Sequence, residues 1–192
     1  MTQKKATVAE ALPAAPVPQR NWHLARTPHE VATTEFEWAL LRFTQAWERW
    51  VVQLGSLTGM GELSYIENVV LHVIRMQDRP KTAAQIARQL NRDDLPNIQY
   101  SLRKLGKMSL CRKVREKSSK TFAYEVTDKG RLLTDNYAEM RRHLLTEQSM
   151  IIGQVDDKLA EATKLINLLT GLYDEAGRIS ATYSSLEEAA GN

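Results

Sequence analysis

Residues 82–110 read TAAQIARQLNRDDLPNIQYSLRKLGKMSL, and this stretch decides the fold. Thr82 and Gln85 have the spacing of a capping box, in which two side chains satisfy free backbone N–H groups at the start of a helix. We expect this short helix to end at a turn over residues 91–94. A second helix should begin near Pro96, because the missing N–H of proline costs nothing in a first turn. The apolar positions on the two helices recur with helical spacing: Ile86, Ala87, Leu90, Ile98, Leu102 and Leu105.

Directly after these helices the pattern changes from helical to alternating. Basic side chains alternate along residues 111–117, Ser118 and Ser119 indicate a turn, and Thr121–Thr127 (TFAYEVT) is rich in β-branched and aromatic residues. We expect a β-hairpin with a very basic first strand and tip. One face of its second strand should carry Phe122, Tyr124 and Val126. Two short helices followed by a basic hairpin are typical of a winged helix-turn-helix, so we predict a mostly α fold with a small β-wing (α+β).

Longer helices are predicted on both sides of this module. Thr34–Glu37 is a capping box that predicts the start of the first helix, and the apolar residues of Phe36–Leu54 then follow at spacings of 4 and 3, as in a helix–helix seam. Ser64–Glu67 is a further capping box. The apolar stripe of Val155–Ile179 is long and narrow, which favours packing against a partner helix.

These features divide the chain into five parts. Residues 1–28 form an Ala/Pro-rich tail with little to pack, which we expect to be disordered. Residues 62–130 should form a winged helix DNA-binding domain. Residues 29–61 and 131–183 should form dimerisation helices, and residues 184–192 a flexible end.

Positive charge is concentrated in the middle of the chain. The net charge is +3 over 192 residues, yet Arg75–Arg131 contains 15 Lys+Arg and 6 Asp+Glu, a local excess of +9. The remainder has 11 basic and 17 acidic residues. Such asymmetry favours a surface that faces a polyanion, although charge alone leaves open a merely solvated basic face.

The helix from Pro96 to about Ser109 is predicted to read DNA. An α-helix fits the major groove, where Asn and Gln bond adenine and Arg and Lys reach guanine or phosphate, while a hairpin beside it reaches the neighbouring backbone or minor groove. A solvated helix face would mix Glu with Lys, but this helix has no acidic residue after Asp94. The predicted DNA-binding residues are Asn97, Gln99, Tyr100, Arg103, Lys104 and Lys107 on the helix and Lys113, Arg115, Lys117 and Lys120 on the hairpin.

Several short segments, taken in order, resemble the MarR family of bacterial transcription regulators. The segments are Leu63-Ser64, Val70-Leu71, Thr82–Leu90, Asn97–Leu110 and Thr127-Asp-Lys-Gly130. The match covers roughly Thr34 to Leu172. The resemblance implies a winged helix homodimer whose first and last helices interleave. It also implies repression at pseudo-palindromic operators in double-stranded DNA, often relieved by small phenolic or aromatic acids.

The sequence departs from the family in the length of its Pro-rich N-terminal tail and C-terminus, and at two places within the matched region. The usual wing has an Asp followed shortly by an Arg at its tip, whereas residues 115–120 read REKSSK, so the wing keeps its charge without that salt bridge. Ser109-Leu110 replaces the usual Gly-Leu after the reading helix.

The resemblance also places an effector cleft beside the first two long helices. A buried aromatic carboxylate would need a compensating cation and an aromatic wall. The predicted effector-binding residues are Trp38, Arg42, His72 and Arg75. A solvated or dimer-interface rim is the alternative reading of the same residues.

Composition excludes several classes. No apolar run approaches a membrane span and no signal peptide is recognisable, so we expect a cytoplasmic protein without a membrane contact. The single cysteine, Cys111, excludes an intramolecular disulfide and is predicted to be a small core residue rather than a redox sensor. The four histidines are scattered, which predicts no metal site, and no catalytic motif is present, so neither an enzyme nor a cofactor is expected.

Three functions fit this sequence. A homodimeric DNA-binding regulator, acting as a repressor, is the leading hypothesis. A winged helix adaptor for protein interaction or dimerisation is the alternative, but it would not need the retained polar face of residues 97–107. A sequence-indifferent nucleoid-type binder is the third, and it would bind random DNA as well as an operator.

Overall fold

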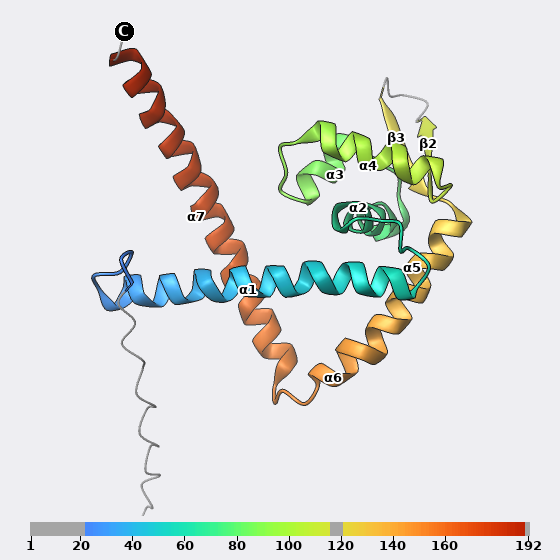
Figure 1. The fold of residues 1–192 in the computed structure, drawn as a ribbon, viewed down its shortest axis with the longest axis horizontal. Helices are drawn as coiled ribbons and strands as arrows, with labels where there is room; N and C mark the ends of the chain where they lie inside the picture. Colours follow the sequence, from blue (N-terminus) through green and yellow to red (C-terminus); the bar gives the residue numbers. More distant parts are fainter. Residues whose placement is uncertain (1–21, 116–120, 191–192) are drawn as a thin grey trace, which may run out of the picture. The chain divides into compact units, whose positions relative to one another are not determined.

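The computed structural model describes residues 22–115 and 121–190 (Figure 1). Its helices are α1 (Pro28–Leu57), α2 (Tyr65–Arg75), η1 (Met76–Asp78), α3 (Ala83–Gln89), α4 (Leu95–Lys107), α5 (Asp128–Arg141), the π-helix η2 (Arg142–Thr146), α6 (Glu147–Ser149) and α7 (Val155–Ala190). Its strands are β1 (Lys81–Thr82), β2 (Cys111–Arg115) and β3 (Phe122–Val126). This mostly helical chain with one small antiparallel sheet in the described part confirms the predicted fold class. Two compact units meet within α1, between Arg49 and Trp50, and are described separately below.

In the first unit, α1 begins earlier than predicted. The helix starts at Pro28, and the capping box that starts it is Thr27 with Glu30: the Glu30 N–H donates to Thr27 Oγ1 at 3.2 Å, and the Thr27 N–H donates to the Glu30 carboxylate at 2.7 Å. Thr34, the predicted start, lies inside the helix and donates to the Glu30 carbonyl at 2.8 Å. The helix begins at the capping box of Thr27 and Glu30 because Pro28 follows Thr27, at the first helical position, where proline is favoured.

In the second unit, the other two predicted capping boxes are confirmed. The Ser64 N–H donates to the Glu67 carboxylate at 2.8 Å at the start of α2, and Thr82 and Gln85 bond reciprocally at the start of α3. Pro96 lies in the first turn of α4, as predicted. This helix ends at Lys107, before the predicted Ser109. Ser109 takes a φ of +59°, in the left-handed region that favours glycine, which ends the helix and leads into the hairpin.

The predicted hairpin is confirmed, and a third strand joins it. The strands β2 and β3 pair antiparallel with Cys111 opposite Val126 and Arg115 opposite Phe122. The short strand β1 pairs with the other edge of β3, which gives the order β1-β3-β2. The sheet therefore ties the segment before α3 to the wing.

One apolar core holds α2, α3, α4 and the base of the hairpin together. Its fully buried members are Leu54, Met60, Val70, Leu71, Ile74, Ile86, Ile98, Leu102, Leu105 and Leu110. Gly130, in the first turn of α5, lies so close to this core that an added Cβ would stand 2.2 Å from the Leu110 carbonyl oxygen. This close approach gives a physical reason for the glycine in Thr127-Asp-Lys-Gly130.

Helix α7 leaves most of its apolar residues exposed, including Leu159, Leu168, Leu172 and Tyr183. Its backbone continues to Ala190, past the predicted boundary at 183. Residues 1–21 of the predicted tail lie outside the described residues. Among the described residues, no helix is both long and apolar enough to cross a membrane.

Candidate nucleic-acid interface

The helix α4 presents a polar and basic face to solvent. Ile98, Leu102 and Leu105 are buried and hold the helix against the core. The residues on its opposite face are exposed: Asn97, Gln99, Tyr100, Arg103 and Lys107. The Arg103 guanidinium carbon lies 5.9 Å from the centre of the Tyr100 ring, a distance at which a cation is attracted to the ring face.

The wing continues this face. Lys113 and Arg115 are exposed on β2, and their charged ends lie 5.5 Å and 5.6 Å from the centre of the Phe122 ring. Phe122 is itself 49 % exposed, and it supports the two cations. Sequence reasoning did not single out Phe122 for this role; the pairing of Arg115 with Phe122 across the hairpin was the signal that could have revealed it. The predicted contacts Lys117 and Lys120 lie outside the described residues.

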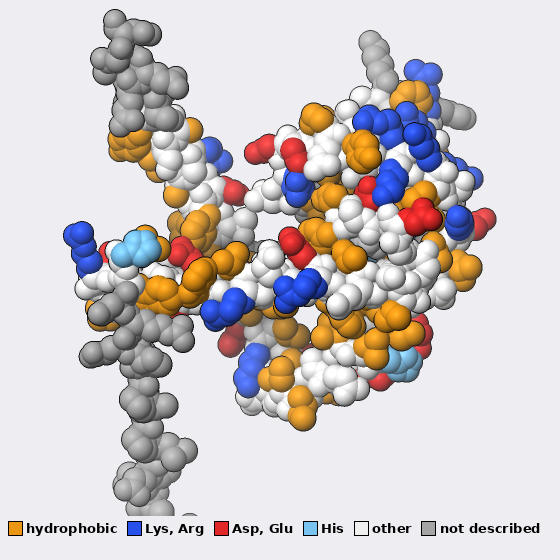
Figure 2. All heavy atoms as spheres, in the orientation of Figure 1, with side chains coloured by type: hydrophobic (Ala, Val, Ile, Leu, Met, Phe, Trp, Pro, Cys, Tyr) orange, Lys and Arg blue, Asp and Glu red, His pale blue; other side chains and the backbone are white. Residues whose placement is uncertain are grey.

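A groove joins the helix and the wing. Its cavity of about 480 Å³ is lined by Gln99 and Arg103 of α4, by Lys113, Phe122 and Tyr124 of the hairpin, and by the start of α3. In the space-filling view, blue side chains gather over the part of the molecule that contains α4 and the strands (Figure 2). Lys113 makes no ion pair with a carboxylate in the described part of the chain, and the same holds for Arg103. This groove is therefore the candidate interface for a polyanion.

Two other basic residues nearby are neutralised locally. Arg112 lies beside Lys113 but forms an ion pair with Glu125 at 2.6 Å. Arg92, in the turn before α4, bonds Asp94 through two nitrogens, at 2.8 Å and 2.6 Å. The hydrogen bonds from Arg92 lower the pKa of Asp94 to about 2, so this carboxylate stays charged. The Asp94 carboxylate also accepts a hydrogen bond from the Asn97 side-chain amide at 3.2 Å.

Lys104 stands apart from the other predicted DNA contacts. Its ammonium group donates to the Glu67 carboxylate and to the Glu62 carbonyl, both at 2.7 Å. The Glu67 side chain is only 5 % exposed. Burial alone would raise the pKa of Glu67, but the hydrogen bonds from Lys104 and Ser64 outweigh it and lower this pKa. Lys104 thus joins α4 to the capping box of α2.

Comparison with known proteins bears directly on this arrangement of helices and hairpin. Residues 63–130 match the family model described as a winged helix DNA-binding domain. This segment has the winged helix fold. No protein of curated function matches the sequence.

Solved structures match the chain beyond the winged helix domain. The transcriptional regulator BldR from Sulfolobus solfataricus is 17 % identical with a TM-score of 0.59, and the match covers 71 % of this chain and 95 % of that one. A MarR family transcription regulator is 15 % identical, with a TM-score of 0.63 and coverage of 78 % and 96 %. A variant of MarR from E. coli complexed with operator DNA is 15 % identical, with a TM-score of 0.58 and coverage of 70 % and 93 %.

These matches confirm the resemblance to the MarR family at the level of the fold. The matched structures named above are those of transcription regulators, and the likeness at 15–17 % identity concerns the fold.

The residues predicted for an effector are divided between the two units. Trp38 and Arg42 belong to the first unit, where the Trp38 ring packs edge-on against Trp22 with centres 6.1 Å apart. His72 and Arg75 belong to α2, which is part of the winged helix domain. The structure thus brings together His72 and Arg75, one helical turn apart.

His72 is largely buried beside Tyr137, with ring centres 4.4 Å apart. Burial lowers the pKa of His72 to about 4, so its imidazole is neutral at pH 7 and supplies no positive charge. Its Nε2 atom is buried and has no hydrogen-bond partner in the described part of the chain. His72 can therefore offer a hydrogen bond, but not the charge that an acid requires.

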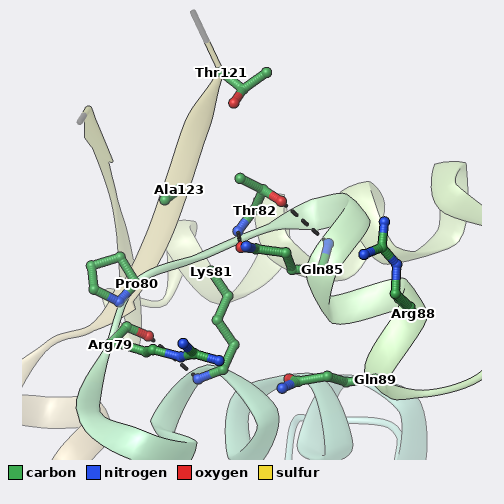
Figure 3. A pocket seen from close by; sticks show the side chains of 9 residues that line it. All are labelled: Arg79, Pro80, Lys81, Thr82, Gln85, Arg88, Gln89, Thr121 and Ala123. Atoms are coloured by element: carbon green, nitrogen blue, oxygen red, sulfur yellow. Dashed lines mark hydrogen bonds between the residues drawn. The ribbon is translucent and has the colours of Figure 1, made fainter. Parts of the chain in front are cut away.

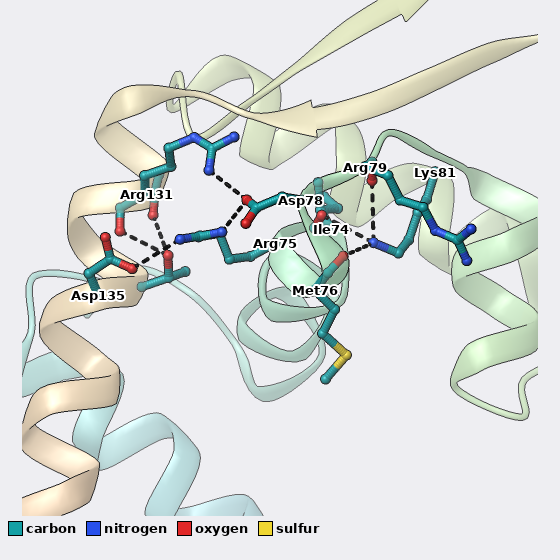
Figure 4. A network of polar contacts seen from close by, with 10 residues as sticks. Ile74, Arg75, Met76, Asp78, Arg79, Lys81, Arg131 and Asp135 are labelled. Atoms are coloured by element: carbon teal, nitrogen blue, oxygen red, sulfur yellow. Dashed lines mark hydrogen bonds and ion pairs between the residues drawn. The ribbon is translucent and has the colours of Figure 1, made fainter.

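Arg75 belongs to a charged network that ties α2 to α5 (Figure 4). It pairs with Asp78 and, at 3.4 Å, with Asp135, while Arg131 pairs with Asp78 at 2.6 Å. Hydrogen bonding to Asp78 raises the pKa of Arg75, and the two arginines lower the pKa of Asp78. The charge of Arg75 is thus already compensated within the protein.

Cys111 is 3 % exposed at the start of β2, and its Sγ lies 3.8 Å from the Leu102 carbonyl. Burial raises the pKa of the thiol to about 11, so it is protonated at neutral pH. These values support its prediction as a core residue. Within the described residues, no three side chains of His, Cys, Asp or Glu are grouped to hold a metal ion.

Proposed function

We propose that the protein is a cytoplasmic, homodimeric transcription regulator that represses by binding a pseudo-palindromic operator in double-stranded DNA. The observation that carries this proposal is the groove between α4 and the wing. Gln99, Arg103 and Lys113 line it, the cations lack carboxylate partners in the described part, and the domain around it is a winged helix. An adaptor that does not bind DNA would have no use for these unpaired cations.

The geometry supports a division of roles between helix and wing. Gln99 and Arg103 project from α4, the helix that enters the major groove in such domains, and their side chains can bond base edges in bidentate fashion. Lys113 and Arg115 project from the wing, where phosphates are the expected partners. Helix residues should therefore set sequence preference, and wing residues should set general affinity.

Fluorescence anisotropy with DNA from upstream of the protein's own gene, against a random duplex, tests this division. Arg103→Ala should cost about 1–3 kcal/mol and relax preference at particular base pairs. Lys113→Ala should weaken all sequences alike and lower the salt slope by about 0.9. Arg112→Ala is the matched control, because Arg112 is next to Lys113 in β2 but its guanidinium is already paired with Glu125. Equal binding of both duplexes by the wild type would favour the nucleoid-type binder, and no binding would favour the adaptor.

We propose dimerisation because α7 exposes more apolar surface than a solvated helix needs. Leu159, Leu168 and Leu172 are 57 %, 71 % and 66 % exposed, and an exposed apolar stripe of this length marks a protein interface. Light scattering should give twice the chain mass of 21.8 kDa. Removal of residues 155–192 should abolish both the dimer and tight operator binding. A monomer at micromolar concentration, or a dimer that survives the truncation, would contradict this assignment.

We also propose that a small aromatic acid relieves repression. The support is the buried, unpartnered Nε2 of His72 beside the Tyr137 ring, which together offer a hydrogen bond and an aromatic wall. Because His72 is neutral and Arg75 already has two acidic partners, neither of them supplies an uncompensated charge, and Arg42, in the first unit, remains a predicted cation.

A screen of phenolic acids for release of labelled DNA tests the effector. Arg42→Ala and His72→Phe should leave DNA affinity nearly intact and weaken release. Trp38→Ala should weaken it through loss of an aromatic wall. A normal response of all three variants to a releasing acid would place the site elsewhere.

A further inference from the structure

A second cavity lies beside the start of α3 (Figure 3). Its volume is about 400 Å³, within the range of small-molecule sites. Arg79, Lys81 and Arg88 line it with Gln85 and Gln89, and none of its lining residues is acidic. The cavity thus gathers three cations from the loop before β1, from β1 itself and from α3.

These charges are not neutralised inside the protein. Arg79 and Arg88 are exposed, and neither guanidinium forms an ion pair or hydrogen bond with another described residue. The nearby carboxylate of Asp78 is already bound by Arg75 and Arg131 (Figure 4). An anion entering the cavity would therefore find two guanidinium groups without competing partners.

Lys81 adds a fixed charge at the edge of this cavity. The residue is 2 % exposed, and its ammonium group donates to the backbone carbonyls of Ile74, Met76 and Arg79 rather than to a carboxylate. Burial lowers the pKa of Lys81, and the positive charge of Arg79 lowers it further. Two cations are thus held near each other at a cost that a bound anion would relieve.

We propose that this cavity binds the phosphate group of a small polar phosphate monoester through Arg79 and Arg88. A phosphate monoester carries nearly two negative charges at neutral pH and has three strong acceptor oxygens, which matches two planar guanidinium forks better than a single carboxylate does. Gln85 uses its side-chain oxygen on the Thr82 N–H, so its amide N–H groups stay available to the ligand.

The cavity borders the groove of the proposed function, but phosphate binding in the cavity does not depend on that function. Thr82 and Thr121 line both this cavity and the groove between α4 and the wing. A ligand bound here would lie against residues that also border the DNA-facing groove. The binding itself requires only the folded chain, so it can be tested with no DNA present.

Isothermal titration calorimetry of the full chain with inorganic phosphate as the minimal probe, at constant ionic strength set with chloride, tests the site. We expect saturable binding of one phosphate per chain. Arg79→Ala and Arg88→Ala should each weaken it about tenfold or more, since each removes a charge-assisted contact. Arg88→Lys should weaken it less than Arg88→Ala, because it keeps the charge but loses the fork.

Arg103→Ala is the matched control, since it removes an equally unpaired, exposed arginine from the neighbouring groove. It should leave phosphate binding unchanged while weakening DNA binding. Because Arg79 and Arg88 are exposed, their variants should melt like the wild type. Absence of saturable phosphate binding, or equal loss in all three alanine variants, would overturn the proposal. So would variants of Arg79 and Arg88 that bind DNA less tightly but bind phosphate normally, since the cavity would then be a contact for the DNA backbone.

Discussion

Replacement of Lys104 tests whether this lysine stabilises the fold, while Lys107 on the same helix is predicted to contact DNA. Lys104→Ala removes two hydrogen bonds of 2.7 Å and leaves the Glu67 carboxylate, whose side chain is 5 % exposed, with the backbone N–H and side chain of Ser64 as its remaining partners at the α2 start. Loss of a partner of a fully buried ion pair costs about 3–5 kcal/mol, and loss of a hydrogen bond to a charged group about 1.5–3 kcal/mol. The Lys104 side chain is 34 % exposed, so water can replace part of its contribution and the lower range applies.

The expected loss of unfolding free energy is therefore about 1.5–3 kcal/mol. For a chain of this size, 1 kcal/mol shifts the melting temperature by about 2–4 °C, so Lys104→Ala should melt about 3–12 °C below the wild type. Calorimetric or circular-dichroism melts at one fixed protein concentration measure this shift, because the stability of a dimer depends on concentration.

Lys107→Ala is the matched control for this experiment. Lys107 lies three residues after Lys104 on the same helix. It is exposed and makes no ion pair with a described residue. Its replacement should change stability by less than about 0.5 kcal/mol and should weaken DNA binding with a lower salt slope. The folded Lys104 variant should bind DNA nearly as the wild type does. Equal stability of the two variants, with weaker DNA binding only for Lys104→Ala, would refute the structural role.

The pH dependence gives the same prediction an internal check. The pKa of Glu67 is lowered in the folded protein, so its charged form stabilises the fold above its ordinary pKa of 4.5 and this contribution is lost as the pH falls through the folded value. The wild type and Lys104→Ala should therefore differ most at neutral pH and converge in acid. A difference that persists unchanged well below pH 4.5 would mean that lost packing, not the ion pair, causes it.

Three further predictions follow from buried positions. Gly130→Ala should lower stability by at least about 2 kcal/mol in a chemical denaturation series, because its Cβ would stand 2.2 Å from the Leu110 carbonyl oxygen; a melt like the wild type's would show that α5 shifts freely. The neutral His72 should contribute stability above pH 6.5 that is lost towards pH 4, by up to about 3 kcal/mol, and His72→Phe should flatten this part of the pH profile; an unchanged profile would assign the loss to other groups. The Cys111 thiol should resist peroxide and iodoacetamide in the native protein and react once it is unfolded, since burial raises its pKa to about 11; rapid native labelling would refute its buried placement.

Local sequence signals predicted those parts of the fold that local interactions determine. The capping boxes that begin at Ser64 and Thr82 each involve only two residues three positions apart, and both are present in the structure. The hairpin was equally predictable, because its alternation and its turn lie within one short segment. The start of α1 was wrong because two boxes of the same kind, beginning at Thr27 and Thr34, compete in one sequence and the proline after Thr27 decides between them.

Features that depend on tertiary contacts could not be predicted in this way. The strand β1 has only two residues, so it has no periodicity, and it becomes a strand because Lys81 and Thr82 pair with Tyr124 and Ala123. Lys104 looked like its basic neighbours because its partner Glu67 lies 37 positions away. The neutral state of His72 likewise depends on burial, which spacing along α2 does not reveal.

The pattern of ion pairs explains how a modest net charge can produce a sharply basic surface. Between Arg75 and Arg131 the chain carries an excess of nine positive charges, but its acidic residues do not neutralise the cations evenly. Three of the six acids of this segment pair with its cations: Asp78 with Arg75 and Arg131, Asp94 with Arg92, and Glu125 with Arg112. Four of the cations that form no ion pair in the described part line the two cavities beside the α3 start: Arg79, Arg88, Arg103 and Lys113. Since exposed unpaired cations contribute little to folding, we propose anionic ligands for them: DNA in the groove of α4 and the wing, and a small phosphate in the cavity beside β1.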